Sequence, residues 1–220
     1  MIEKTIASGY FRHHKGQIYF VHGVAKHSET LEDYIVYETR YDNPLGKLWI
    51  RPKKMFEESI QKNGGTVQRF APLDWTIIEK SLPSSNEFNE IMKISESIFG
   101  KSYPEKLKGE LEASTRWLFL FAKDKDNKTV GFKYGKARNS KEFFSANGGV
   151  LPEFRNLGVA SLLMKTQHDW VKKNDYIRID TTTRNHFPEM LRLNLKFGYK
   201  IMGCTTEGGE PKIHLSKELK

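Results

Sequence analysis

Apolar and polar residues follow two different patterns along the chain. Before residue 72, short runs rich in β-branched and aromatic residues are separated by turns, which predicts short strands. One helix is expected from Pro52 to Asn63, because Phe56 and Ile60 lie one helical turn apart. Short strands with a single small helix predict a compact barrel-like β domain over residues 1–72.

From residue 73 onward, strands and helices alternate. Strands are expected at 75–79, 117–122, 129–136, 143–150, 176–180, 200–204 and 212–215, and helices at 87–99, 157–173 and 189–197. The strand, helix and strand between residues 143 and 180 imply a parallel pair joined by a crossover helix. This part is therefore expected to form a mixed α/β (α+β) domain, residues 73–220, with helices flanking its sheet.

Composition and charge narrow the class of protein. No apolar run approaches the roughly 18 residues that a membrane helix needs, and a single cysteine, Cys204, fits the reducing cytoplasm. Cys204 is expected to be a small buried residue of a late strand. The net charge of +9 would suit a nucleic acid, but basic residues are interleaved with acidic ones. An anionic ligand such as a nucleotide cofactor fits this diffuse positive field at least as well.

The most informative stretch runs from residue 148 to residue 160, where a strand ends at Pro152 and a loop opens directly into a helix. The first amides of a helix lack backbone partners and carry the positive end of its dipole, so they can bind a pyrophosphate. Gly158 and Ala160 are small enough to let it approach, and Arg155 adds a positive charge. The alternative is a plain strand-to-helix connection with a surface arginine.

The spacing of these residues also resembles a known signature. Arg155-x-x-Gly158-x-Ala160, preceded by Val150-x-Pro152, is similar to the cofactor-binding motif of the GNAT superfamily of N-acetyltransferases. The final expected helix, which ends in Gly198-Tyr199, resembles the last helix of that family. The resemblance covers about two-thirds of the chain and implies a sheet that splays open beside the strand at 143–150.

The resemblance implies a set of residues that contact acetyl-CoA. Val150 would use its N–H to polarise the thioester carbonyl and hold the oxyanion. Asn185 would contact the pantetheine arm. The implied backbone contacts are the strand edge Gly149, Val150 and Leu151 for the pantetheine, and the loop and helix start Asn156, Leu157, Gly158, Val159, Ala160 and Ser161 for the pyrophosphate.

Asn194 stands where many members of the family carry a tyrosine that protonates the departing thiolate. An amide cannot serve as that acid, although it can donate a hydrogen bond to sulfur. Another donor or water would have to act, or the thiolate would leave unprotonated, which a thiol pKa of about 8.5 tolerates. Glu142 is a candidate base for the acceptor amine, and a solvated surface charge is the alternative interpretation of this residue.

The N-terminal part has a resemblance of its own. The runs His27-Ser28-Glu29-Thr30, Leu48-Trp49-x-Arg51-Pro52 and Arg69-Phe70 are similar to a small bacterial family of unknown function with an SH3-like β-barrel. A base, hydroxyls and an acid at 27–30 invite a catalytic interpretation, but adjacent residues seldom form a triad. Turn capping or ligand recognition is favoured instead. No metal is expected, because the histidines match no standard ligand spacing: His13, His14, His22 and His27.

The function expected from this sequence is acetyl-CoA-dependent N-acetyl transfer, directly to a primary amine of a small molecule or a protein. Val150, Asn194 and Glu142 are the candidate catalytic residues. The alternative is a catalytically silent domain of the same fold, with the barrel reading a peptide or a nucleic acid. Neither the acceptor nor the oligomeric state can be deduced from the sequence.

Overall fold

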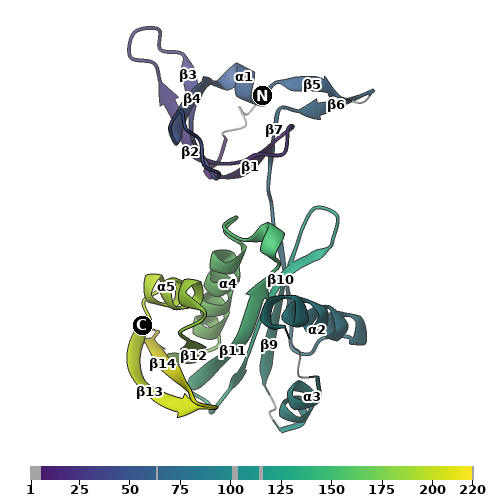
Figure 1. Ribbon diagram of the computed structural model, residues 1–220, viewed down its shortest axis with the longest axis vertical. Helices are drawn as coiled ribbons and strands as arrows, with labels where there is room; N and C mark the ends of the chain where they lie inside the picture. The colour runs from purple at the N-terminus through teal and green to yellow at the C-terminus, as the bar shows by residue number, and fades with distance from the viewer. Residues whose placement is uncertain (1–5, 63, 101–103, 114–115, 220) are drawn as a thin grey trace. The chain divides into compact units, whose positions relative to one another are not determined.

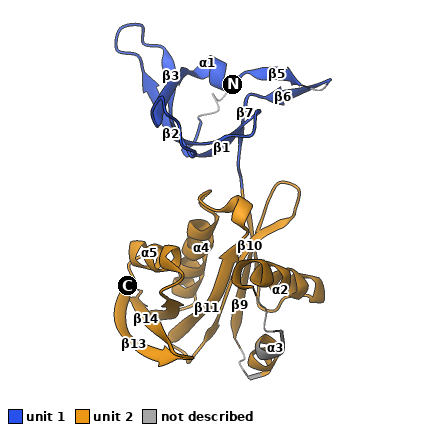
Figure 2. Ribbon diagram, viewed as in Figure 1, with its two compact units in different colours: residues 1–74 blue, residues 75–220 orange. Residues whose placement is uncertain are grey.

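The protein divides into two compact units, which the computed structural model describes over residues 6–62, 64–100, 104–113 and 116–219 (Figures 1 and 2). Unit 1 is Met1–Asp74 and unit 2 is Trp75–Lys220. Unit 1 contains β1 (Gly9–His13), β2 (Ile18–Lys26), β3 (Asp33–Thr39), β4 (Leu48–Pro52), α1 (Lys53–Glu57), β5 (Ser59–Lys62), β6 (Gly65–Gln68) and β7 (Phe70–Pro72).

Unit 1 is built on one open antiparallel sheet. Its five strands lie in the order β4-β3-β2-β1-β7, and β5 pairs only with β6 in a separate hairpin. Among the described strands, β4 and β7 are therefore free edges, and the closed barrel expected from the sequence is not formed. The core on this sheet combines Val21 and Ile35 with aromatic residues, and the rings of Phe56 and Phe70 are stacked at 4.1 Å between centroids.

The helix expected from Pro52 is much shorter than the apolar spacing suggests. It ends at Glu57, and Glu58 is already extended, with ψ 138°. Ile60 pairs with Val67 in the β5–β6 hairpin, so it does not continue a helical face. The expected end of the helix at Asn63 lies outside the described residues.

Unit 2 is a seven-stranded mixed sheet flanked by helices, in the order β13-β14-β12-β11-β10-β9-β8. Among the described strands of this sheet, only β11 and β12 pair in parallel, and α4 crosses between them, as the sequence predicts. Its elements are β8 (Thr76–Lys80), α2 (Ser85–Phe99), α3 (Pro104–Ala113), β9 (Trp117–Lys123), β10 (Thr129–Ala137), β11 (Glu142–Val150), a 3-10 turn (Pro152–Phe154), α4 (Val159–Lys173), β12 (Arg178–Arg184), α5 (Pro188–Lys196), β13 (Lys200–Glu207) and β14 (Glu210–Glu218).

The sheet of unit 2 has helices on both faces (Figure 1), and a hydrophobic core lies on each face. On one face, α4 packs with Leu163 and Met164 against the sheet, and α5 lies on the same side. On the other face, α2 and α3 cover Phe119 and Phe121. None of the described helices combines the length and the apolar character that crossing a membrane would require.

The strand β13 forms one edge of this sheet, and each of its residues is exposed. Its register with β14 shifts between Ile201 and Gly203, which leaves Met202 as a bulge. Cys204 is exposed on this strand, which corrects the expectation of a buried thiol. The apolar pattern at 200–204 is that of a strand, but no helix covers it among the described residues.

Candidate active site

The strands β11 and β12 separate halfway along their length. They pair only from Glu142 to Ser145 on β11, although β11 continues along β10 as far as Val150. A β-bulge at Ala146 lies at the point of separation, because Ser145 and Asn147 pair with consecutive residues of β10. The segment from Ala146 to Val150 therefore has a free edge on the side of β12 among the described strands.

The backbone of Val150 faces this free edge. The amide of Leu151 donates to the carbonyl of Val130 at 2.9 Å, so the alternation of an antiparallel ladder turns the neighbouring Val150 groups away from β10. The Val150 carbonyl accepts a hydrogen bond from Arg155 Nε at 3.4 Å. The Val150 N–H points into the gap between β11 and β12. Gly148 faces the same way, and its amide donates to Asn147 Oδ1 at 2.7 Å.

The chain then turns into α4 through two left-handed residues. Asn156 has φ 60° and Gly158, the residue before the helix, has φ 80°. The first helical hydrogen bond runs from Leu162 N to Gly158 O, so the amides of the three residues between them have no helical acceptor. No side chain caps this end among the described residues. The amino end of α4 is thus open to an anion.

Gly149 lies where α2 approaches the strand. A Cβ built there would lie 2.5 Å from Ile98 Cδ1. The absence of a side chain therefore lets α2 pack directly on the free half of β11. The hydrophobic residues Leu157 and Val159 are buried beneath the loop, and the carbonyl of Leu157 accepts a hydrogen bond from Trp75 Nε1 at 3.2 Å.

Asn194 lies on α5, on the α4 side of the sheet, and is 1% exposed. Its Nδ2 is buried and has no hydrogen-bond partner among the described residues. A buried amide donor without a partner carries a desolvation cost, so it points to a ligand or a water molecule as the missing acceptor. Asn185 is exposed in the short connection between β12 and α5.

Glu142 is not brought together with Val150 and Asn194. It opens β11, eight residues before Val150, at the end where β11 and β12 are still paired. Its carboxylate lies 2.7 Å from Arg178 Nη2 in an ion pair. This position favours the interpretation of Glu142 as a partly solvated charge.

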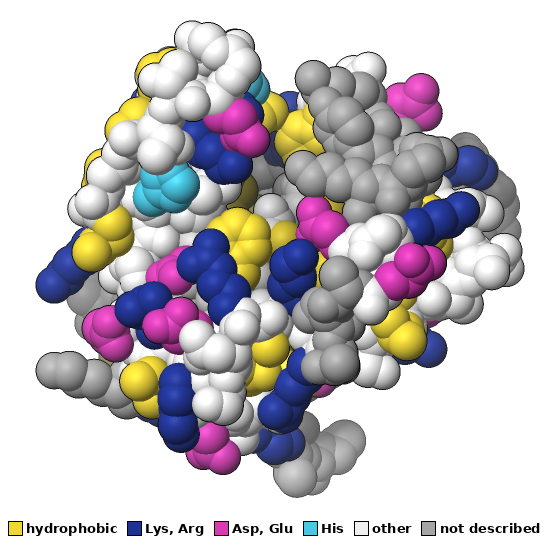
Figure 3. Space-filling view, turned by 90° about the horizontal axis from the view of Figure 1, so that it is seen from below, with side chains coloured by type: hydrophobic (Ala, Val, Ile, Leu, Met, Phe, Trp, Pro, Cys, Tyr) yellow, Lys and Arg dark blue, Asp and Glu magenta, His cyan; other side chains and the backbone are white. Residues whose placement is uncertain are grey.

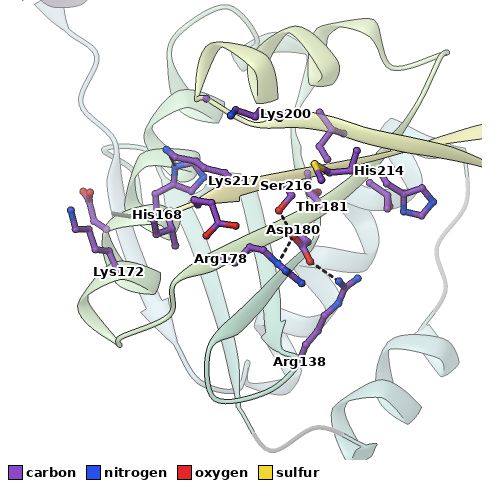
Figure 4. Close-up of a pocket in the computed structure, with 17 residues that line it drawn as sticks. Arg138, His168, Lys172, Arg178, Asp180, Thr181, Lys200, His214, Ser216 and Lys217 are labelled. Atoms are coloured by element: carbon purple, nitrogen blue, oxygen red, sulfur yellow. Dashed lines mark hydrogen bonds and ion pairs between the residues drawn. The ribbon is translucent and has the colours of Figure 1, made fainter.

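A cavity of about 950 Å³ lies elsewhere, at the carboxyl end of α4 and the adjoining ends of β12 and β14 (Figure 4). Asp180 is at its centre and accepts hydrogen bonds from Arg138 and Ser216, both at 2.7 Å. The α4 residues that line it, His168, Asp169 and Lys172, are at least ten positions beyond Gly158. The cavity is therefore separate from the open amino end of α4.

His168 on α4 is buried against Tyr199 and Lys217. Its Nε2 lies 3.1 Å from the Tyr199 hydroxyl, and its Nδ1 accepts from Lys217 Nζ at 3.2 Å. Burial, reinforced by the charges of Lys217 and Lys133, lowers the His168 pKa to about 3, so the imidazole is neutral near pH 7. The apolar stripe at Leu163, Met164 and Val171 could have revealed this, because His168 shares that face of α4.

The charged surface is mixed rather than uniformly basic. On the face seen in Figure 3, Lys and Arg side chains lie next to Asp and Glu side chains. Arg178 contacts both Glu142 and Asp180, and Arg184 contacts both Glu207 and Glu210. This arrangement agrees with the interleaved charge of the sequence.

The splayed sheet and the open helix start define an acetyltransferase type of α/β domain. The sequence model of the acetyltransferase (GNAT) family matches residues 88–199, and the chain belongs to this family. Residues 9–72 match a second family, described as a protein of unknown function (DUF1653). No curated protein matches the chain.

Solved structures share the fold of unit 2. Ard1 from Thermoplasma volcanium superposes with a TM-score of 0.57 at 19% identity, covering 66% of this chain and 98% of its own. The ribosomal-protein-S18-alanine N-acetyltransferase from Escherichia coli gives 0.56 at 14% identity, with 66% and 94% covered. A GNAT family acetyltransferase from Elizabethkingia anophelis, with acetyl-CoA bound, gives 0.50 at 19% identity, with 66% and 98% covered.

Proposed function

We propose that this chain is an acetyl-CoA-dependent N-acetyltransferase that moves the acetyl group directly to a primary amine. The observation that carries the proposal is the free edge of β11 at Ala146–Val150, which leads through the loop at residues 151–158 to the uncapped amino end of α4. The free backbone groups of β11 are thus followed along the chain by the open amides of α4. An extended arm that ends in a pyrophosphate is complementary to such a path.

The residues present fit acetyl-CoA as the donor. The amides of Val159, Ala160 and Ser161 would bind the pyrophosphate, with Gly158 leaving room and Arg155 adding charge. The loop amides of Asn156, Leu157 and Gly158 would add to the pyrophosphate contacts. The strand residues Gly149, Val150 and Leu151 would contact the pantetheine arm, and Asn185 would contact it from the connection between β12 and α5. The Nδ2 of Asn194 is the buried donor that lacks an acceptor in the protein.

The roles of the side chains and amides follow from this placement. The N–H of Val150 would hold the oxyanion that forms when the amine attacks the thioester carbonyl. Asn194 would donate a hydrogen bond toward sulfur without supplying a proton. Glu142 is held by Arg178 at the other end of β11, so we assign it no role as a base.

The relatives support the donor and the class of acceptor. One structural neighbour has acetyl-CoA bound, and another is named for the alanine of a ribosomal protein. We propose that residues 73–220 carry the transfer and that residues 1–72 form a separate domain. The amine acceptor belongs to a small molecule or to a protein.

Calorimetry of the full chain with acetyl-CoA tests the donor, and a panel of amines tests the transfer. The panel should include amino acids, polyamines and peptides with a free N-terminus or lysine, with release of free thiol as the measured signal. Binding together with amine-dependent thiol release is the expected result. Binding without release for every amine class would favour the catalytically silent alternative, and no binding at millimolar acetyl-CoA would overturn the proposal.

A further inference from the structure

Lys133 is a lysine buried in the interior of unit 2. It lies on β10 and is 6% exposed. Its neighbours Phe132 and Tyr134 pack on the α2 side, so Lys133 points to the opposite face, beneath α4. Among the described residues, no hydrogen bond or ion pair involves its ammonium group. Burial alone lowers the Lys133 pKa to about 8.

The side chain of Lys133 lies beside the free half of β11. Lys133 is the register partner of Gly148, which precedes Val150 by two residues. A Cβ built on Gly148 would lie 3.3 Å from Lys133 Cγ, so the lysine chain packs into the space that the glycine leaves. The stem of Lys133 is therefore packed against the free half of β11, and its charge lies near enough to His168 on α4 to lower the pKa of that imidazole.

Other polar groups on this side of the sheet also lack partners. Both amide atoms of Gln167 on α4 are buried without a hydrogen bond among the described residues, as is Nδ2 of Asn194 on α5. Lys133 and these amides offer donors toward the interior on the face that α4 and α5 cover. Such groups are costly to bury unless something in the working protein accepts from them.

We propose that Lys133 supplies the positive charge and the proton that sulfur takes when the acetyl–sulfur bond of the donor breaks. This inference rests on the proposed function and fills the gap left by Asn194, which has no acidic proton to give. An ammonium in a water-poor interior stabilises a developing thiolate far more than it would in water.

The transfer exchanges one carbon–sulfur bond for one carbon–nitrogen bond. The neutral amine nitrogen forms a bond to the acetyl carbon, the carbon–sulfur bond breaks, and its electron pair goes to sulfur. Sulfur takes a proton from the Lys133 ammonium and becomes a thiol. The acylated nitrogen loses its proton to water, and the Lys133 amine recovers one from solvent, so one amine and one thioester give one amide and one thiol.

Few charged groups lie near Lys133 in the part of unit 2 that the structure describes. From β9 the opposing residue is Leu120, and from β11 it is Gly148. From α4 the titratable neighbour is His168, whose pKa Lys133 helps to lower, and Lys217 on β14 stands behind that imidazole. His168 is neutral above pH 4, so it does not titrate between pH 6 and 10. The absorbance of the protein without CoA is subtracted at each pH, because it includes the exposed thiol of Cys204.

The test follows the ultraviolet absorbance of the thiolate of CoA bound to the full chain as the pH is raised. In the wild type we expect the bound thiol to titrate below the free value of about 8.5. In Lys133→Met, which keeps the length of the chain without its charge, we expect a pKa higher by about one pH unit, a roughly tenfold smaller thiolate fraction at a given pH. Lys133→Gln serves as a second neutral variant in case methionine disturbs folding.

Lys136→Met is the matched control on the same strand, because Lys136 forms an ion pair with Glu110 at 2.9 Å and is partly exposed. It should titrate like the wild type. Identical titrations for the wild type and both Lys133 variants would overturn this inference and leave the proposed function standing. Failure of CoA to bind the wild type would overturn both.

Discussion

Gly158 is the position where one substitution best separates folding from donor binding. Its φ of 80° is left-handed, and a side chain there costs roughly 1–2 kcal/mol. For a domain of this size, each kcal/mol lowers the melting temperature by about 2–4 °C, so Gly158→Ala and Gly158→Glu should both melt about 2–8 °C below the wild type. This loss is common to the two variants, because it arises from the backbone.

The two variants should differ once acetyl-CoA is added. At one hundred times its Kd, a ligand stabilises the native state by about 2.7 kcal/mol, which corresponds to roughly 5–11 °C for the wild type. Glutamate places a negative charge where the pyrophosphate would meet the open amides of α4, so Gly158→Glu should show no shift. Gly158→Ala, which adds no charge, should keep a measurable one. Differential scanning fluorimetry compares the three proteins, and an equal shift in the wild type and Gly158→Glu would refute the placement of the pyrophosphate.

Three further predictions concern single side chains. Arg155→Ala should raise the Kd of acetyl-CoA by no more than about fivefold in calorimetry, because the arginine is exposed and the amides remain. Asn194→Ala should weaken acetyl-CoA binding by roughly two- to tenfold, with a smaller change in kcat at saturating donor if the amide gives no proton. His168→Gln should make the folding stability less sensitive to acid. The pKa of His168 is about 3 in the folded protein and about 6.5 in the unfolded chain. The wild type therefore has its full stability above pH 6.5 and loses stability as the pH falls below that value. Melting temperatures at pH 7.5 and pH 5 measure that difference, and equal losses in both proteins would contradict it.

The strand-to-helix turn was predictable because its signals are local. Pro152, Gly158 and the apolar stripe of α4 follow one another in the sequence, and each restricts the backbone without help from distant residues. The strands of unit 2 lie close to their predicted positions. Among the helices, α3 is not predicted from the sequence. Its weak apolar pattern gives little sign of a helix until Leu107 packs against the core of α2 and the sheet.

Other features depend on contacts that a single sequence does not contain. The spacing of Phe56 and Ile60 suits a helix, but pairing of Ile60 with Val67 across a hairpin takes precedence. The burial of Lys133 is similarly hidden, since a lysine between two aromatic residues in a strand normally indicates a solvent-facing side. Only the placement of α4 over that face reveals it.

The exposed strand β13 has a consequence for how the protein behaves at high concentration. An open edge presents unpaired N–H and C=O groups that can recruit a strand from another molecule, and Ile201 and Met202 would add apolar contact. The bulge at Met202 breaks the regular spacing of that edge, and Lys200 and Glu207 place charges at its two ends. The same bulge therefore protects the chain from edge-to-edge aggregation, and straightening it by deleting Met202 would remove that protection.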